Sequence, residues 1–156
     1  PLVFDNGMKG HVYGLEMAAS WNVSTDWRLK LAYSWLESEL KRKPGSTDTT
    51  SPMVWDRSPP HQVNLRSLWN VSDDIQFDST LGYVDGLPHT DVPSYFRLDV
   101  RLGWQVSADF DVSVIGSDLL DDRHPEFVEF SGNAPGQGLT STQVERHWLL
   151  QGRWRF

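Results

Sequence analysis

Hydrophobic and polar residues alternate along most of this chain with a period of two. The clearest run lies at 96–105. Its apolar positions are Phe96, Leu98, Val100, Leu102 and Trp104, and its polar positions are Arg97, Asp99, Arg101, Gly103 and Gln105. Side chains of a β-strand point alternately to two faces, so the pattern predicts a strand with one apolar and one polar face. A helical period of 100° would instead scatter the charged residues among the apolar ones.

The same alternation recurs in about seven runs, most of them longer than the roughly 5–6 residues usual for a soluble strand. The runs cover 12–21, 27–35, 62–71, 75–83, 96–105, 110–120 and 144–156. A tilted strand that crosses a membrane needs about 9–11 residues, so these lengths suit membrane strands. The chain is therefore predicted to be all-β and antiparallel.

The connections between these runs alternate in length. Short ones are expected at 22–26, 71–74 and 106–109, whereas long ones are expected at 41–60 and 121–142, with an intermediate one at 85–94. The longer ones contain the turn formers Pro, Gly, Asn and Asp. Short turns on one side and long loops on the other are typical of an outer-membrane barrel meander. The fold predicted is an up-and-down transmembrane β-barrel segment.

A repeated motif marks the short turns: Trp-Asn-Val-Ser at 21–24 and 69–72, and Trp-Gln-Val-Ser at 104–107. Two copies match the glycosylation triplet N-x-S, but their position favours turns, with Ser and Asp side chains bonding to the turn backbone. Aromatic residues at both ends of the turns predict a girdle at one membrane interface, where ring N–H groups reach the head groups. The predicted girdle residues are Trp21, Trp27, Trp69, Trp104, Phe110 and Trp154.

Composition changes this picture little. The 156 residues contain no Cys and carry a net charge of -7, which excludes a disulfide scaffold and argues against a nucleic-acid partner. No apolar stretch is long enough for a membrane helix. Because the chain starts at Pro1 with no initiator Met and no signal peptide, we expect it to be a fragment or a processed chain.

Four motifs, in this order, resemble the C-terminal barrel portion of TonB-dependent outer-membrane receptors. They are Gly14-Leu15-Glu16; Ser58-Pro59-Pro60-His61-Gln62; Gly116-Ser117-Asp118-Leu119-Leu120-Asp121 with His124-Pro125-Glu126-Phe127; and the terminal Arg153-Trp154-Arg155-Phe156. Asp118 departs from the Asn usual in that family. The resemblance implies that 1–156 is the C-terminal part of a 22-stranded barrel, whose plug domain and N-terminal strands are absent from this chain.

The resemblance also implies a function, a location and a set of partners. It predicts active, TonB-powered uptake of a scarce ligand, usually a ferric siderophore and sometimes cobalamin, haem or a glycan, in the bacterial outer membrane. The implied partners are the plug domain, TonB, outer-membrane lipid and lipopolysaccharide, and the barrel-assembly machinery, for which Phe156 would be the signal. No enzymatic activity and no cofactor is expected.

Charged residues on the polar faces are predicted to line the barrel lumen. They are Arg66, Asp78, Arg97, Asp99, Arg101, Glu145 and Arg153. One interpretation is a ladder that contacts the plug or an anionic ligand. We favour a lumen wall that neutralises its own charges, since Asp78 and Glu145 are available on neighbouring strands as partners for the arginines.

The long loops supply the remaining candidates. Trp55, His89 and Phe130 could contact a substrate, although each is more simply an ordinary loop anchor. Lys41-Arg42-Lys43 could attract an anionic ligand or a lipopolysaccharide phosphate, but we favour a solvated loop base. The group of Asp121, Asp122, His124 and Glu126 has the residue types of a metal or acid–base site, but we favour a strand that exits into an outer loop. No G-x-S-x-G elbow for nucleophilic catalysis is present.

Two alternatives stay open at this point. A passive porin-like barrel would show the same strands, and the presence of an upstream plug and TonB box would distinguish the receptor from it. A soluble, Trp-rich β-sandwich that binds carbohydrate would instead fold alone in water. A sheet with an apolar outer face and two open edges should aggregate there.

Overall fold

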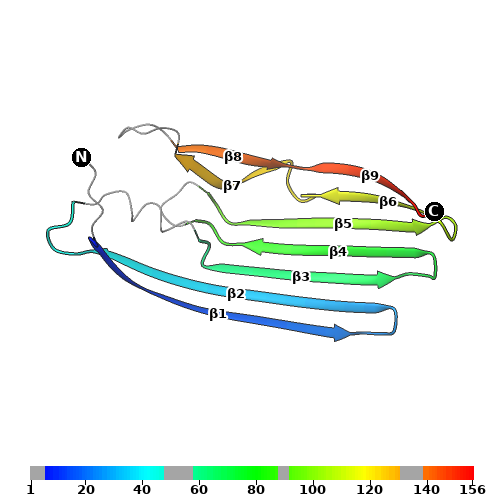
Figure 1. Ribbon diagram of the computed structural model, residues 1–156, viewed down its shortest axis with the longest axis horizontal. Helices are drawn as coiled ribbons and strands as arrows, with labels where there is room; N and C mark the ends of the chain where they lie inside the picture. The colour runs from blue at the N-terminus through cyan, green and yellow to red at the C-terminus, as the bar shows by residue number, and fades with distance from the viewer. Residues whose placement is uncertain (1–5, 48–57, 88–91, 131–138) are drawn as a thin grey trace.

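The computed structural model describes residues 6–47, 58–87, 92–130 and 139–156, which form nine β-strands (Figure 1). The strands are β1 (Met8–Asn22), β2 (Trp27–Arg42), β3 (His61–Asn70), β4 (Ile75–Val84), β5 (Tyr95–Gln105), β6 (Phe110–Ser117), β7 (Arg123–Phe130), β8 (Leu139–Glu145) and β9 (His147–Trp154). Among the described residues no helix is long and apolar enough to span a membrane.

Seven strands form one antiparallel sheet in the order β1-β2-β3-β4-β5-β6-β9. Each strand from β1 to β5 pairs with the next along the chain, as predicted for an up-and-down meander, whereas β6 pairs with β9. The short turns β1–β2, β3–β4 and β5–β6 lie at the same end as the C-terminus, and the longer connections lie at the other end (Figure 1). The predicted segregation of loop lengths is confirmed for the connections from β1 to β6, whereas the segment 121–142 departs from it.

The register gathers the apolar residues of all strands on one face. Leu31 is opposite Leu65, which is opposite Leu81, which is opposite Leu98, and such direct neighbours project to the same side. The intervening residues, including Arg66, Thr80 and Asp99, occupy the other face. The two faces predicted from the alternation are therefore confirmed, and we call them the apolar face and the polar face.

Almost nothing in this sheet is buried. The only apolar residues with less than a tenth of their surface exposed among the described residues are Leu87 and Val92. Large apolar side chains remain open instead, with Trp21 64% and Leu150 72% exposed. A soluble sandwich would bury one face of each sheet in a common core. The described part of the chain has no such core, so the sandwich alternative is wrong.

Successive strands are displaced along one another by about one residue. One row of direct neighbours shows it: Trp27, Trp69, Phe77, Leu102, Val114 and Leu150. The row contains the first residue of β2, but on β5 and β9 it lies three and four residues before the strand end. The distance from the row to the short-turn end of each strand therefore increases across the sheet. A shift of ~3.3 Å for each ~4.8 Å of strand spacing inclines the strands by about 35° to the line of turns. Closed barrels have a strand tilt of about 35–45°.

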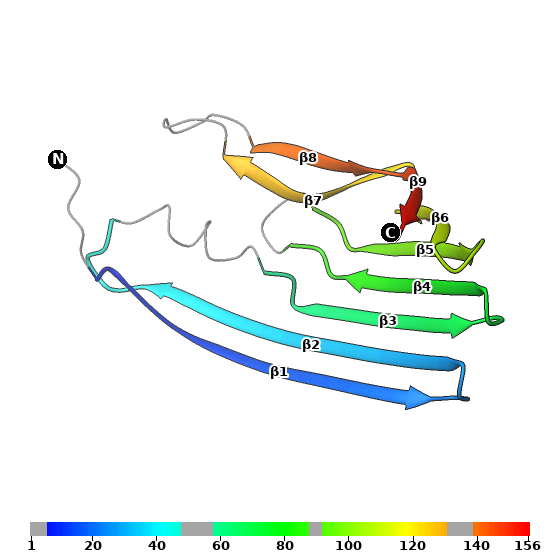
Figure 2. The same cartoon turned by 45° about the vertical axis from the view of Figure 1, so that its right-hand side comes forward.

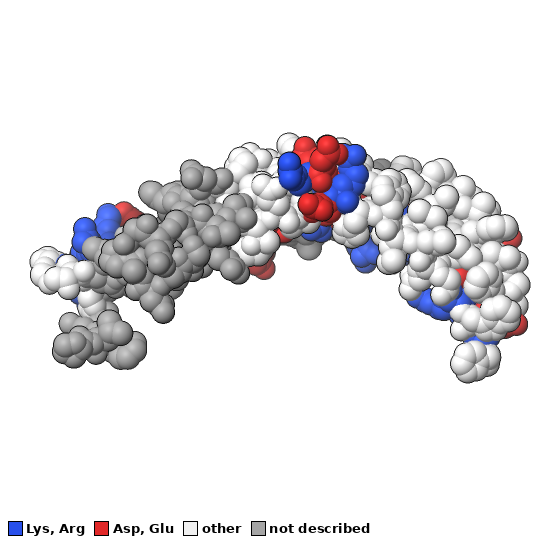
Figure 3. Space-filling view, turned by 90° about the horizontal axis from the view of Figure 1, so that it is seen from above, with Lys and Arg blue, Asp and Glu red and all other residues white. Residues whose placement is uncertain are grey.

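The sheet is strongly bowed when it is seen from above (Figure 3). A hollow of roughly 680 Å³ is lined mainly by residues of the polar face, among them Gln62, Asn64 and Arg97. A curved, tilted sheet whose polar face is hollowed has the shape of a piece of barrel wall, with the polar face toward the lumen.

The segment 121–142 differs from the sequence prediction. Instead of a long loop, it contains most of the hairpin β7–β8, which forms a separate two-stranded sheet. The predicted final strand at 144–156 is divided, because Glu145 pairs with Arg123 of β7 whereas His147 pairs with Ser117 of β6. Figure 2 shows the hairpin standing away from the main sheet and β9 turning sharply from β8.

We expect this chain, expressed alone, to aggregate when denaturant is removed in the absence of detergent, and to gain β-structure in detergent micelles. The reason is the open apolar face together with the unpaired edges of β1 and β9. Light scattering and circular dichroism would check it. A monodisperse, cooperatively melting protein in plain buffer would contradict the membrane assignment.

Candidate functional site

Aromatic residues mark both borders of the apolar face. On β1, β2 and β5, the aromatic residue near the short turn has an aromatic partner eight positions away on the same strand. The pairs are Trp21 and Tyr13, Trp27 and Trp35, and Trp104 and Phe96. Eight residues span ~26 Å along a strand, or about 22 Å along the barrel axis at a tilt of about 35°. The apolar band of an outer-membrane barrel is ~25 Å tall. These residues therefore delimit a membrane-spanning band.

We call the border of the band beside the short turns the lower border, and the opposite one the upper border. The predicted girdle residues all lie at the lower border. Neighbouring rings pair across strands: Trp27 with Trp69 at 6.2 Å between centroids, and Phe110 with Trp154 at 5.4 Å. The Trp27 N–H donates to Ser67 Oγ at 2.9 Å and not to a head group, which differs from the sequence expectation for that ring. Pairing of rings stabilises this edge beyond the area they cover.

The three short turns share one backbone geometry. In each, the Val N–H donates to the carbonyl of the first residue of the next strand: Val23 to Trp27, Val71 to Ile75 and Val106 to Phe110, at 2.9, 2.8 and 2.9 Å. Ser24 Oγ accepts from the Asp26 N–H, and Ser72 Oγ accepts from the Ile75 N–H. The interpretation of the repeated motif as a turn is confirmed.

Beyond the upper border, the apolar and polar faces of β1 and β2 exchange character. Glu37 and Glu39 follow Trp35 on the outward side, whereas Leu36 and Leu40 are turned inward. Lys41 forms an ion pair with Glu39, and this contact lowers the pKa of that carboxyl. Charged residues on the outward side show that this part of the hairpin stands in water above the membrane.

Most predicted lumen residues lie together on the polar face of the sheet. Arg101 Nη1 lies 3.4 Å from Asp78 Oδ2, and Arg97 Nε lies 3.2 Å from Asp99 Oδ2. Arg66 is opposite Lys30 and Thr80, and Arg153 is opposite Asp111. Asp78 thus partners an arginine as predicted. The Arg101–Asp78 and Arg97–Asp99 ion pairs each offset part of the cost of placing charge on the wall of a narrow lumen.

Glu145 is the exception among the predicted lumen residues. It is the last residue of β8 and is opposite Arg123, so it belongs to the hairpin and not to the main sheet. Next to it, Arg146 Nη2 lies 3.1 Å from Asp122 Oδ1. Figure 3 shows acidic and basic side chains gathered in one mixed patch near the middle of that view.

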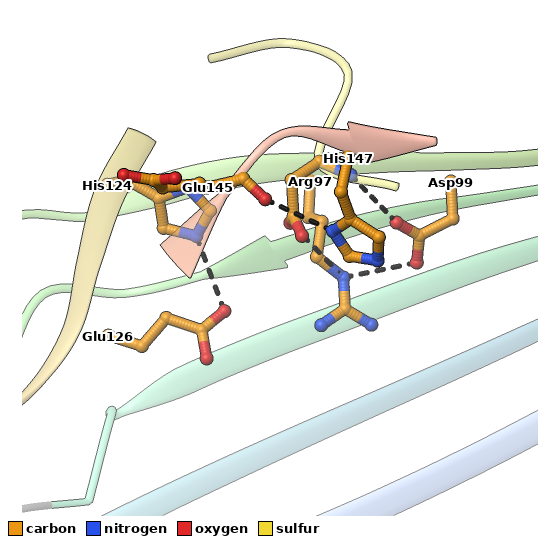
Figure 4. A network of polar contacts seen from close by, with 7 residues as sticks. Arg97, Asp99, His124, Glu126, Glu145 and His147 are labelled. Atoms are coloured by element: carbon orange, nitrogen blue, oxygen red, sulfur yellow. Dashed lines mark hydrogen bonds and ion pairs between the residues drawn. The ribbon is translucent and has the colours of Figure 1, made fainter. Parts of the chain in front are cut away.

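A second polar group lies where β6 passes into β7, and Figure 4 shows it from close by. Asp118 has a φ of 57°, a left-handed conformation that Asp and Asn tolerate better than most residues, and its N–H donates to Asp99 Oδ1 at 3.1 Å. His124 Nε2 lies 3.3 Å from Glu126 Oε1, and the His124 ring packs on Tyr95 with 4.3 Å between centroids. We call Asp118, His124 and Glu126 the rim cluster.

Sequence reasoning missed Asp118 as a member of this group. Asp121, Asp122, His124 and Glu126 had the expected residue types, but Asp121 and Asp122 are exposed, whereas Asp118 and His124 are buried. Burial raises the pKa of the Asp118 carboxyl, which lies beyond the last residue of β6. The available signal was its place directly after a strand, where an Asp or Asn often adopts the left-handed turn conformation.

The predicted loop contacts are only partly placed. Trp55 and His89 lie outside the described residues. Phe130 is the last residue of β7 and pairs with Leu139 across the hairpin. These three therefore stay predictions as substrate contacts.

The fold and its two faces define a wall segment of a membrane β-barrel. The family model "TonB dependent receptor-like, beta-barrel" matches residues 3–117. The chain belongs to this family of TonB-dependent receptors, as the four sequence motifs indicated. Receptors of this family are outer-membrane proteins of Gram-negative bacteria.

Solved receptor structures share this fold. The ferric-catecholate import receptor Fiu from E. coli K12 matches in its open form with a TM-score of 0.66, 20% identity and 94% coverage of this chain. Its closed form gives 0.68, 21% and 96%. The ferric yersiniabactin uptake receptor FyuA from Yersinia pestis gives 0.73, 17% and 97%. The chain spans 21% of either Fiu chain and 24% of the FyuA chain, which is the proportion expected of a barrel segment.

The two faces can be tested with one pair of neighbouring residues on β4. Ser79 and Thr80 are small hydroxyl residues near the middle of the band, and they project to the apolar and the polar face respectively. In the full-length protein, Ser79→Arg should reduce the free energy of unfolding by about 2–4 kcal/mol, the cost of Arg facing lipid at the midplane. Thr80→Arg should cost less than about 1 kcal/mol. Urea unfolding in lipid vesicles measures both, and equal losses would contradict the assignment of the faces.

Proposed function

We propose that this chain forms the C-terminal wall of an outer-membrane receptor that imports a scarce ligand by TonB-dependent transport, most simply a ferric siderophore. The observation that carries the proposal is the family match over residues 3–117 on a sheet with a lipid-facing and a lumen-facing side. Fiu and FyuA, which share the fold, import a ferric catecholate and ferric yersiniabactin. Their ligands support the siderophore class for this chain.

In this function the segment contributes a passage and no chemistry on the substrate. The polar face supplies a charged wall, in which Asp78 pairs with Arg101 and Asp99 pairs with Arg97. A plug domain elsewhere in the full-length protein would fill the lumen and would be pulled by TonB. Transport requires no bond in the ligand to be made or broken, so we propose that the protein is not an enzyme.

Two partners would act on the outside of the wall. Lys9 is opposite Lys41 on the outward side above the membrane band, and Lys41 also forms an ion pair with Glu39. Phosphate groups of lipopolysaccharide would bind Lys9. At the other end, Phe156 is fully exposed and follows the open edge strand β9, which suits recognition by the barrel-assembly machinery.

Uptake in cells tests the proposal. Cells that express the full-length receptor should accumulate a radiolabelled ferric siderophore under iron limitation, and loss of TonB should abolish this uptake. A ferric catecholate and ferric yersiniabactin are the first probes. Uptake that persists without TonB would identify a passive barrel. TonB-dependent uptake of cobalamin or haem in place of both iron complexes would retain the receptor and reject the siderophore class.

Removal of Phe156 from the full-length protein should lower the amount of folded barrel in the outer membrane several-fold, because the terminal aromatic residue would be lost from the assembly signal. Heat-dependent electrophoretic mobility separates folded from unfolded barrel. Phe156→Tyr is the matched control and should retain assembly. Wild-type levels of folded protein without any residue at 156 would reject the assignment.

A further inference from the structure

The rim cluster combines three metal-ligand residue types at one place. Asp118 comes from the β6–β7 turn, and His124 and Glu126 come from β7. One donor atom of each lies within 4.8 Å of the donor atoms of the other two. We propose that Asp118, His124 and Glu126 bind a resident divalent transition-metal cation that fixes the β7–β8 hairpin to the barrel wall.

Burial leaves two of these residues with unsatisfied polar atoms. Asp118 and His124 are each only 6% exposed. Within the described residues, Asp118 Oδ1 and His124 Nδ1 have no hydrogen-bond partner. Almost all buried polar atoms in proteins are paired, since an unpaired one costs about 1–3 kcal/mol. A cation at this cluster would give Asp118 Oδ1 the partner that it lacks.

The charge balance around the cluster also calls for a cation. Asp99, Asp118 and Glu126 are three carboxylates, whereas Arg97 contributes a single positive charge among them. Arg97 mainly serves Asp99, at 3.2 Å, and is 4.0 Å from Asp118. Asp118 is buried, whereas Asp99 and Glu126 are partly exposed, so the cost of unbalanced charge falls mainly on Asp118, and a divalent ion beside it would offset that cost.

The donor set selects the kind of ion. One imidazole nitrogen and two carboxylate oxygens suit Zn²⁺, Co²⁺, Mn²⁺ or Fe²⁺, whereas Ca²⁺ and Mg²⁺ prefer oxygen alone. Metal–ligand bonds of ~2.0–2.2 Å place donor atoms up to roughly 4.2 Å apart, so only small side-chain movements would close the site. Glu126 also lines the hollow on the polar face, so the ion would have free coordination positions on that side.

The site would lie at the upper border of the band, where the wall changes into the hairpin. Asp118 is eight residues from Phe110 on β6, the same spacing that separates the two aromatic borders elsewhere. The cation would therefore be a structural component outside the lipid, distinct from any transported iron. Binding of this cation depends on the fold alone and not on which ligand the receptor imports.

A spectroscopic titration of the full-length protein tests this proposal. After chelator treatment in detergent, Co²⁺ should bind with the visible absorption of a coordinated ion, and Zn²⁺ should displace it. Asp118→Asn and His124→Ala should each weaken Co²⁺ binding at least tenfold, the lower end of what even an outer-shell change costs a metal site. Asp118→Asn preserves the turn, because Asn also tolerates the left-handed conformation and is the family's usual residue there.

His147→Ala is the matched control, since this histidine lies at the same junction but its Nδ1 faces the Glu145 carbonyl at 3.2 Å (Figure 4). The control should bind Co²⁺ as the wild type does. Heat-dependent mobility verifies that each variant is folded. The proposal is overturned if folded wild-type protein binds no more Co²⁺ or Zn²⁺ than folded Asp118→Asn does. Equal weakening by His147→Ala would likewise reject the assignment of the site.

Discussion

The structure depends on one constraint, the pairing of backbone N–H and C=O groups between strands in a medium that offers no water. Within the sheet this constraint is met from β2 to β6, where each strand has a neighbour on both sides. Among the described strands the edges of β1 and β9 have no neighbour, and an open edge is not tolerated in lipid. The wall described here therefore requires further strands at both edges, which a closed barrel would supply.

The same pairing determines how the wall stands in the membrane. Because each strand is displaced by about one residue from its neighbour, the short turns and their aromatic residues follow a line inclined to the hydrogen-bonded rows. Trp21, Trp69 and Trp104 thus occupy one level although they lie in different rows. The level of the upper border follows from the constant spacing of eight residues. The register between strands therefore determines the strand tilt, and the tilt together with the eight-residue spacing determines the height of the membrane band.

Sequence alone was sufficient for the features that repeat. The alternation predicted the seven strands of the main sheet and their two faces, and Trp-x-Val-Ser predicted the turns, because each rests on local periodicity. The hairpin β7–β8 was missed because β7 contains Pro125 and neither strand has a sustained alternation. The rim cluster was only partly found, because burial distinguishes Asp118 from Asp121 and Asp122, and burial depends on β5 lying beside the turn.

Position 118 shows how one residue can serve the fold and add chemistry to it. The turn after β6 needs a residue that accepts a φ of 57°, and either Asn or Asp meets this need. Asp also adds a negative charge beside Asp99 and Glu126, in a place that the wall and the hairpin shield from water. An Asn here would leave only those two carboxylates beside the single positive charge of Arg97. The backbone conformation at position 118 thus does not require a carboxylate. A bound cation would explain why Asp and not Asn occupies this position.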